Sequence, residues 1–288
     1  MDGSSGVAAY KVEQRLSIKA GPAPSDRRAT IGTVEHLLRA TATAETRHFW
    51  FRGFRAFETP LLSYAAAGRS DLRLLDCGCG TGANVDLLSR FGHAYGFDLS
   101  DTGLRIGRDA HRTPLVRASV TAAPFPDAAF DIVTSFDVLY SLEDADERHA
   151  IAEIFRLLKP GGFAIVNVAA MQALRGDHSV LSREIRRYDR DDLRVRITGA
   201  GFTIVRLTYT NASLFLPLAI ARAIQRARGL RTETDCEAQR EISIPAAPVN
   251  EALAALLRLE GLWLRRFDAP FGSSLLCLAR KPSDPSRP

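Results

Sequence analysis

The stretch Leu72–Gly82, LRLLDCGCGTG, decides the fold of this 288-residue chain. An apolar run ends in Asp76, and three glycines follow at alternate positions, Gly78, Gly80 and Gly82. The next residues carry apolar side chains at helical spacing, so the pattern predicts a strand, a glycine-rich turn and a helix. Glycines let the backbone pass close to a ligand, and the first turn of a helix offers free N–H groups. The stretch therefore indicates a nucleotide-binding α/β unit.

The glycine spacing also fits the dinucleotide pattern G-x-G-x-x-G/A loosely, with Ala83 in the last place. Two features argue against a dinucleotide. Asp76 ends the strand, where its carboxylate repels a pyrophosphate and attracts an ammonium group. The second is LLKPGG at 157–162, which leads into an apolar strand that a dinucleotide fold does not require.

With these motifs in this order, residues 45–202 resemble class I S-adenosylmethionine-dependent methyltransferases, and the resemblance returns near the C-terminus. The similarity is greatest to the bacterial small-molecule (methyltransferase type 11-like) group. It implies an α/β, Rossmann-like fold: a seven-stranded, mostly parallel sheet flanked by helices, with N-terminal helices and a helical insertion before the last strand. It also implies S-adenosylmethionine as cofactor and S-adenosylhomocysteine as product. The cofactor contacts that it implies are Asp76, Gly78, Cys79, Gly80, Gly82, Asp98, Leu99, Ser119, Val120 and Phe136.

Two of these residues, Asp98 and Ser119, are expected to bind the cofactor through hydrogen bonds. Asp98 ends the next expected strand, where a carboxylate can accept hydrogen bonds from both ribose hydroxyls. Dinucleotide and methyltransferase folds share this feature, so it supports nucleotide binding without deciding which kind. The resembling family usually has an Asp near Ser119 that contacts the adenine amino group, and a serine hydroxyl bonds more weakly than a charged group.

The N-terminal sequence ETRHFWFRGFRAF (45–57) has aromatic side chains on too many faces for a simple amphipathic helix. One interpretation is packing against the sheet. The other is a lid over the cofactor, because the family has a similar H-x-W-F…R stretch before its first strand. On that reading His48, Trp50 and Arg52, together with Phe215 of the later insertion, face the substrate.

The candidate catalytic residues follow the fourth and fifth expected strands. Tyr140 stands where the family often carries Glu. It either lines the methyl-transfer site or only forms part of the pocket wall. Related sequences read L-x-x-x-H-D…G-H-x-R-R-Y where this chain has His178, and Glu184 replaces one family histidine. His178 is a general base or an ordinary polar residue of a loop. Glu184 is a base, a stabiliser of a cation, or an ion-pair partner of the neighbouring arginines.

Periodicity predicts the other elements and the organisation of the chain. Expected strands lie at 93–98, 115–117, 130–136, 163–168, 202–210 and 273–280, and expected helices at 31–38, 43–67, 101–109, 145–158, 189–200, 214–227 and 251–267. A turn is expected at 159–162 and a loop at 232–248, with Ser100 and Asp189 as helix caps. The expected parts are a disordered tail (1–30), a helical lid (31–70), an S-adenosylmethionine-binding methyltransferase core (71–210), a helical insertion (211–271), a last core strand (272–281) and a tail (282–288).

The composition sets further limits. The net charge of +5 is a mild excess that indicates solubility rather than nucleic-acid binding. Four cysteines form no disulfide framework and no metal site, so we expect a reducing, cytoplasmic compartment. The first ten residues do not read as a signal peptide, and the longest apolar run, 212–221, is too short to span a bilayer.

The first functional hypothesis is therefore an enzyme that methylates a small, largely apolar metabolite of a natural-product, isoprenoid or lipid-like kind at oxygen or carbon. The second is a methyltransferase acting on nucleic acid or protein. Against it, the amino-methylation signature (N/D)-P-P-(Y/F) is missing where DVLY (137–140) stands. The third is a protein that binds the cofactor without catalysis. We expect a small-molecule partner, no nucleic acid, no transmembrane segment and no metal, and leave peripheral lipid contact and homodimerisation open.

Overall fold

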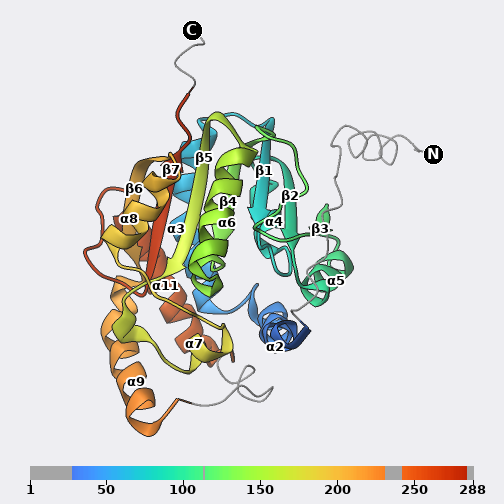
Figure 1. Cartoon of the computed structure of the whole chain (residues 1–288). Coiled ribbons are helices and arrows are strands. Elements are labelled where there is room, and N and C mark those ends of the chain that lie inside the picture. The colour runs from blue at the N-terminus through green and yellow to red at the C-terminus, as the bar shows by residue number, and fades with distance from the viewer. Residues whose placement is uncertain (1–27, 113, 231–241, 284–288) are drawn as a thin grey trace, which may run out of the picture.

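The computed structural model describes residues 28–112, 114–230 and 242–283. A seven-stranded sheet forms its centre, with helices on both sides (Figure 1). The strands are β1 (Leu72–Cys77), β2 (Gly92–Asp98), β3 (Leu115–Arg117), β4 (Phe130–Phe136), β5 (Leu158–Ala169), β6 (Thr203–Thr210) and β7 (Ser274–Arg280). The α-helices are α2 (Arg28–Ala44), α3 (Phe49–Ala66), α4 (Ala83–Leu88), α5 (Asp101–Asp109), α6 (Asp144–Leu157), α7 (Asp177–Leu181), α8 (Arg190–Gly199), α9 (Phe215–Arg228) and α11 (Ala247–Leu264).

The strand order is β3-β2-β1-β4-β5-β7-β6. β1 to β5 pair in parallel, whereas β7 runs antiparallel to both β5 and β6. The chain winds outward in one direction from β1 and in the other from β4. This topological switch point is where open α/β sheets bind ligands, at the carboxyl ends of the strands. The expected seven-stranded, mostly parallel sheet is confirmed.

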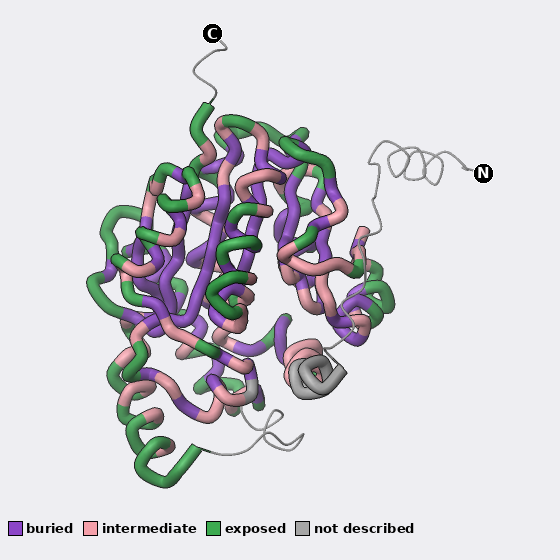
Figure 2. Tube along the Cα trace, in the orientation of Figure 1, coloured by how far each residue is buried: buried purple, intermediate pink, exposed green. Residues whose placement is uncertain are grey.

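The central strands are buried because helices cover both faces of the sheet. Every residue of β4 is buried, and in β1 only Arg73 is exposed. Figure 2 shows buried strands through the middle of the molecule, while α9 is largely exposed. None of the described helices is long and apolar enough to span a membrane.

Several expectations about individual elements need correction or fall outside the described residues. The first helix runs over 28–44, well beyond the expected 31–38, and α11 begins at 247 instead of 251. The KPGG residues do not end the helix before a separate strand. Leu158 already pairs with Phe130, and Phe163 pairs with Ile132, so residues 159–162 bulge out of one long strand. Residues 28–30 of the expected disordered tail (1–30) belong to α2 instead. The rest of that tail (1–27), residues 232–241 of the expected loop (232–248) and residues 284–288 lie outside the described residues.

The N-terminal helices and the insertion pack against each other. Glu251 of α11 forms an ion pair with Arg52 of α3. The Asn250 side chain accepts a hydrogen bond from the Phe49 N–H at 2.9 Å and donates one to the Arg47 carbonyl at 2.9 Å. A small apolar cluster also joins α2 to Ile242. Two segments 200 residues apart in sequence therefore form one layer.

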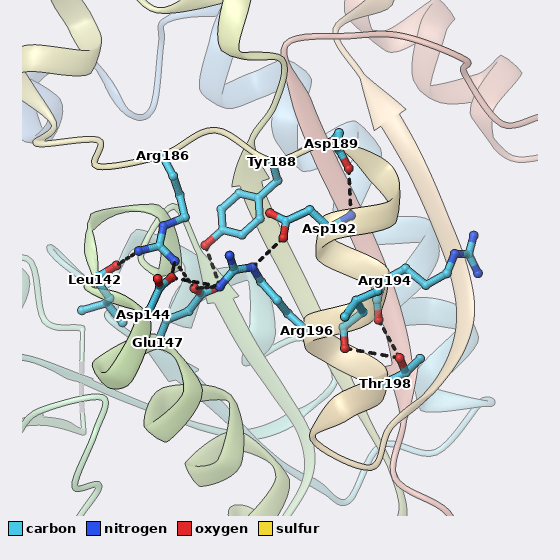
Figure 3. Close-up of polar contacts among 11 residues, drawn as sticks. Leu142, Asp144, Glu147, Arg186, Tyr188, Asp189, Asp192, Arg194, Arg196 and Thr198 are labelled. Atoms are coloured by element: carbon cyan, nitrogen blue, oxygen red, sulfur yellow. Dashed lines mark hydrogen bonds and ion pairs between the residues drawn. The ribbon is translucent and has the colours of Figure 1, made fainter.

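A buried polar cluster fixes the segment that carries Glu184. Glu147 of α6 accepts hydrogen bonds from the Tyr188 hydroxyl at 2.8 Å and from Arg196 at 2.5 Å, and it also pairs with Arg186 (Figure 3). Arg186 additionally donates to the Leu142 carbonyl at 2.9 Å. The cluster ties α6, α8 and the residues before α8 together. Arg186 and Tyr188 of the R-R-Y motif thus have structural contacts.

Candidate active site

The glycine loop after β1 turns sharply at the switch point. The N–H groups of Gly78 and Cys79 donate to the Phe97 carbonyl at 2.9 and 3.0 Å, which fastens the loop to β2. Gly78, Gly80 and Gly82 have φ values of +78°, +54° and +77°. Only glycine adopts this left-handed region without strain, so the turn requires glycine at these three alternate positions.

The space beside Gly80 is open except on one side. A Cβ built on Gly80 meets a single atom, Cδ2 of Leu38 in α2, at 3.1 Å. A Cβ on Gly78, by contrast, overlaps Val138 at 2.3 Å. Gly78 is therefore needed for packing, whereas Gly80 leaves a backbone surface that a ligand can approach, with α2 beside it.

Asp98 joins the end of β2 to this loop. Its carboxylate accepts hydrogen bonds from the Gly80 N–H at 2.8 Å and from the Ser100 N–H at 2.7 Å. Burial raises its pKa, and these backbone hydrogen bonds oppose the shift. Each carboxylate oxygen has a second lone pair, so Asp98 retains acceptor capacity for hydroxyl groups.

The remaining predicted cofactor positions border the same end of the sheet. The Leu99 carbonyl accepts a hydrogen bond from Arg117 at 3.1 Å. The Ser119 hydroxyl bonds to the Thr121 hydroxyl at 2.8 Å, and Val120 between them is half-buried. Ser119 can still reorient toward a base, because a hydroxyl both donates and accepts.

Asp76, one residue before the end of β1, and Phe136, the last residue of β4, lie at the switch point. Asp76 is buried and accepts a hydrogen bond from the Thr134 hydroxyl at 2.6 Å. Burial raises its pKa to about 7, despite the opposing hydrogen bond from Thr134. Burial thus favours the neutral carboxyl group, and a cationic ligand would shift it toward the charged form.

The predicted lid residues have contacts within the helical layer. His48 caps α3, where its Nδ1 accepts from the Trp50 N–H at 3.1 Å, and burial lowers its pKa. Arg52 pairs with Glu251, and Phe215 packs against Phe271 with ring centroids 5.2 Å apart.

The sequence analysis did not single out Glu45, which connects this helical layer to the glycine loop. Its carboxylate accepts from the Thr81 hydroxyl at 2.6 Å and pairs with Arg112 at 2.5 Å.

The three predicted catalytic residues differ in their surroundings. Glu184 is buried and forms a two-point ion pair with Arg187, at 2.7 and 3.1 Å. The Tyr140 side chain is buried, which raises its pKa, and the charges of Asp137 and Glu184 add to the shift. Tyr140 and Glu184 therefore lie near each other. His178, expected in a loop, lies half-buried in the short helix α7, which packs beside α2.

Asp137 is a candidate that the sequence analysis did not single out. It follows β4 directly and is exposed, although Phe136 before it and Leu139 after it are buried. Its φ is +60°, and Asn167 holds it from both sides: the Asn167 side chain donates to its carboxylate at 2.9 Å, and the Asn167 carbonyl accepts its N–H at 3.0 Å. Residues in this region of φ and ψ cluster at functional sites.

The electrostatic setting of Asp137 suits proton transfer. Although Asp137 is exposed, the protein groups packed around its carboxyl group displace part of its hydration and raise its pKa to about 7, and the charge of Glu184 adds to this. Strongly shifted pKa values cluster at functional sites. A carboxylate of this kind can accept a proton near neutral pH. A simple signal was present in the sequence: like Asp76, Asp137 is an acid placed directly at the end of a buried strand.

Comparison with known proteins agrees with this geometry. Residues 75–166 match the family model described as a methyltransferase domain. The chain is 35% identical over 116 residues to the ubiquinone/menaquinone biosynthesis C-methyltransferase UbiE of Shewanella piezotolerans, which covers 35% of this chain and 44% of that protein. UbiE of Vibrio vulnificus is 36% identical over 112 residues, with 42% of its length covered. The chain therefore spans less than half the length of these curated relatives.

Solved structures show the same fold. The [4+2]-cyclase SpnF aligns with a TM-score of 0.59 at 20% identity, covering 92% of this chain and 98% of that chain. Phosphoethanolamine N-methyltransferase 2 of Haemonchus contortus, in complex with S-adenosyl-L-methionine, aligns with a TM-score of 0.54 at 16% identity, covering 89% of this chain and 59% of that chain. Residues 75–166 thus match a methyltransferase domain, and the resemblance of the sequence to class I S-adenosylmethionine-dependent methyltransferases is confirmed.

Proposed function

We propose that the protein is an enzyme that transfers the methyl group of S-adenosylmethionine to a small, largely apolar acceptor at oxygen or carbon. The observation that carries the proposal is the arrangement at the switch point. Asp76 and the glycine loop lie at the end of β1, and Asp98 ends β2. The accessible Asp137 follows β4, which pairs directly with β1. A cofactor on the loop and an acceptor over Asp137 would meet at the same edge of the sheet.

The residues fit the cofactor. The backbone beside Gly80 is open to a ligand, Asp98 retains lone pairs for ribose hydroxyls, and Asp76 suits an ammonium group. When bound, S-adenosylmethionine supplies a methyl group that is already activated by its positively charged sulfur. The protein then has to hold the acceptor in line and to accept its proton.

Asp137 is our first candidate for the proton acceptor. For a hydroxyl acceptor, the carboxylate would take the O–H proton while the new O–C bond forms and the C–S bond breaks. Glu184 is the weaker candidate for this step, because Arg187 already occupies both of its oxygens. Tyr140 would serve as a hydrogen-bond donor, since its raised pKa keeps the hydroxyl protonated. His178 is the base that an acceptor bound nearer α2 would use.

An apolar acceptor has support from the surface and from the relatives. Leu216, Ile220 and Ile224 follow one another at four-residue spacing on α9 and are exposed. Such a stripe fits contact with a lipid or with an apolar substrate. The UbiE relatives are named for quinone biosynthesis and C-methylation. We therefore expect phenol- or quinol-type acceptors with an apolar side chain.

A panel of such acceptors tests the proposal. The full chain, S-adenosylmethionine and each acceptor are incubated, and mass spectrometry measures S-adenosylhomocysteine together with the methylated product. Asp137→Asn should lower turnover by about a hundredfold or more, the usual scale for a general base, with cofactor affinity kept. If Asp137→Asn has full turnover while His178→Ala or Glu184→Gln does not, the base is assigned to those residues.

A second candidate is catalysis without methyl transfer, because the similar fold of SpnF is that of a protein titled a cyclase. The same assay separates the two. Acceptor consumption without S-adenosylhomocysteine would support the second candidate. Methyl transfer to RNA or protein, and no transfer to the small acceptors, would support a macromolecular substrate.

A further inference from the structure

The carboxyl group of Glu58 lies inside the protein without a partner. Glu58 belongs to helix α3 and is completely buried, with a relative exposure of 0%. Neither carboxyl oxygen has a hydrogen-bond partner in the described parts of the chain. Burying an ionised carboxylate with nothing to compensate its charge is costly. Glu58 must therefore be neutral in the free protein, or a bound cation must complete its surroundings.

Its position is at the switch point of the sheet. Phe54 lies one helical turn before Glu58 on the same face of α3, and its ring meets that of Phe136 edge-on at 5.0 Å. Asp76 and Asp137 lie close enough that their charges oppose ionisation of Glu58. Glu58 thus lies near the ends of β1 and β4 that carry Asp76 and Phe136. Three carboxyl groups from three elements converge there.

The surrounding charges do not compensate this cluster. Arg55, on the same helix, favours the charged form of Glu58, but its guanidinium donates to the Glu45 carbonyl at 3.1 Å. The groups that face the other two carboxyls are Asp98, Thr134 and Asn84 around Asp76, and Glu184, Asn167 and Arg187 around Asp137. In the described parts of the chain, no group of three or more His, Cys, Asp or Glu side chains is arranged to hold a metal ion.

We infer that Glu58 responds to the charge of the cofactor sulfur: it is a neutral carboxylic acid in the free protein and becomes a carboxylate when a sulfonium ligand binds. The inference rests on the proposed cofactor. S-adenosylmethionine and S-adenosylhomocysteine share their ammonium and carboxylate groups and differ by one methyl group and one positive charge. The proton of Glu58 goes to solvent when the sulfonium binds and returns from solvent after transfer, when the sulfur is neutral. Glu58 thereby favours the substrate form of the cofactor over the product form.

Calorimetry on the full chain tests this inference. S-adenosylmethionine and S-adenosylhomocysteine are titrated near neutral pH in two buffers with different heats of ionisation, which gives the protons released on binding. Asp76 is proposed to bind the ammonium group common to both ligands, so its contribution should cancel in the comparison. We expect the sulfonium ligand to release up to about one proton more than the thioether, and its relative affinity to rise with pH by at most about tenfold per unit. Equal proton release by both ligands overturns the inference.

Glu58→Gln assigns the proton to this residue, because glutamine keeps the shape and removes the titration. The extra proton release should vanish, and the preference for S-adenosylmethionine over S-adenosylhomocysteine should fall about tenfold. Glu143→Gln, at an exposed position before α6, should change neither. If Glu58→Gln does not fold, Asp137→Asn decides: the extra proton release must persist when the other carboxyl group that titrates near the proposed sulfur position is removed. Failure to bind S-adenosylmethionine at any pH contradicts the proposed function itself, whereas equal proton release contradicts the inference alone.

Discussion

The hydroxyl of Thr81 in the glycine loop donates a hydrogen bond of 2.6 Å to the buried carboxylate of Glu45, which precedes α3. The same carboxylate pairs with Arg112, which also donates to Asp86 at 2.9 Å. The N-terminal layer is thus joined to the loop through buried, charged groups. Movement of this layer and the shape of the loop should be coupled.

Glu45→Ala tests that coupling. The substitution leaves Arg112 mostly buried with a partner removed, so the free energy of unfolding should fall by about 3 kcal/mol. Urea denaturation measures it. Arg105→Ala, which breaks an exposed pair with Asp101, is the matched control and should leave the free energy of unfolding almost unchanged. Equal effects of the two substitutions would mean that the buried pair has no special role.

The pKa of Asp76 predicts a pH dependence of stability. Its value rises from 3.8 to about 7 on folding, so the folded protein binds more protons than the unfolded chain between these two values. Stability should therefore fall as the pH rises from about 4 to about 7, by at most about 4 kcal/mol for this group. Asp137 adds a change of the same sign.

Denaturation midpoints over this pH range, measured for the wild type and Asp76→Asn, isolate the contribution of Asp76. Asparagine does not titrate, so the variant should lose stability less steeply with rising pH. Glu143→Gln should keep the wild-type slope. A variant slope as steep as that of the wild type would show that Asp76 does not titrate in this range.

Tyr188→Phe tests the buried cluster around Glu147. The change removes one hydrogen bond to a buried carboxylate and leaves the two arginine partners, so it should cost about 2 kcal/mol in the free energy of unfolding. Chemical denaturation gives this value. A loss below about 0.5 kcal/mol would mean that the arginines alone satisfy Glu147.

Gly80→Val tests the open side of the loop. A β-branched residue is strained at a φ of +54°, and its side chain occupies the surface that the cofactor is proposed to cover. Binding of S-adenosylmethionine should be abolished in calorimetry. Gly199→Val is the control, because no atom lies near its Cβ and its φ is not positive. If a folded Gly80→Val variant keeps its affinity for S-adenosylmethionine, the cofactor does not bind at this surface.

The sequence predicted those parts of the fold that depend on local patterns. The strand before Asp76, the positive-φ turn at Gly80 and the cap at Ser100 each follow from a few adjacent residues. The seven-stranded, mostly parallel sheet follows from the resemblance, and it is confirmed. The bulge at 159–162 was missed, because Pro and Gly signal a turn whether or not the strand continues around it.

Much of the candidate site could not be predicted, because it depends on contacts between distant residues. Glu45 meets Thr81 across 36 positions, and Glu58 approaches Asp76 from a separate helix. The residues next to Glu45 and Glu58 in the sequence show no pattern that distinguishes these two acids from those on an ordinary helix surface. Glu184, by contrast, was identified in the sequence, with three possible roles: a base, a stabiliser of a cation, or an ion-pair partner. Its two-point contact with Arg187 favours the ion pair.

Binding of S-adenosylmethionine by the full chain, compared with NAD and repeated with Asp98→Ala, tests the central claim most directly. Isothermal calorimetry should show saturable binding of S-adenosylmethionine and none of NAD. Asp98→Ala should weaken the affinity by about 1–3 kcal/mol through lost ribose hydrogen bonds. Binding of NAD in preference to S-adenosylmethionine, or an affinity unchanged in a folded Asp98→Ala variant, would contradict the account.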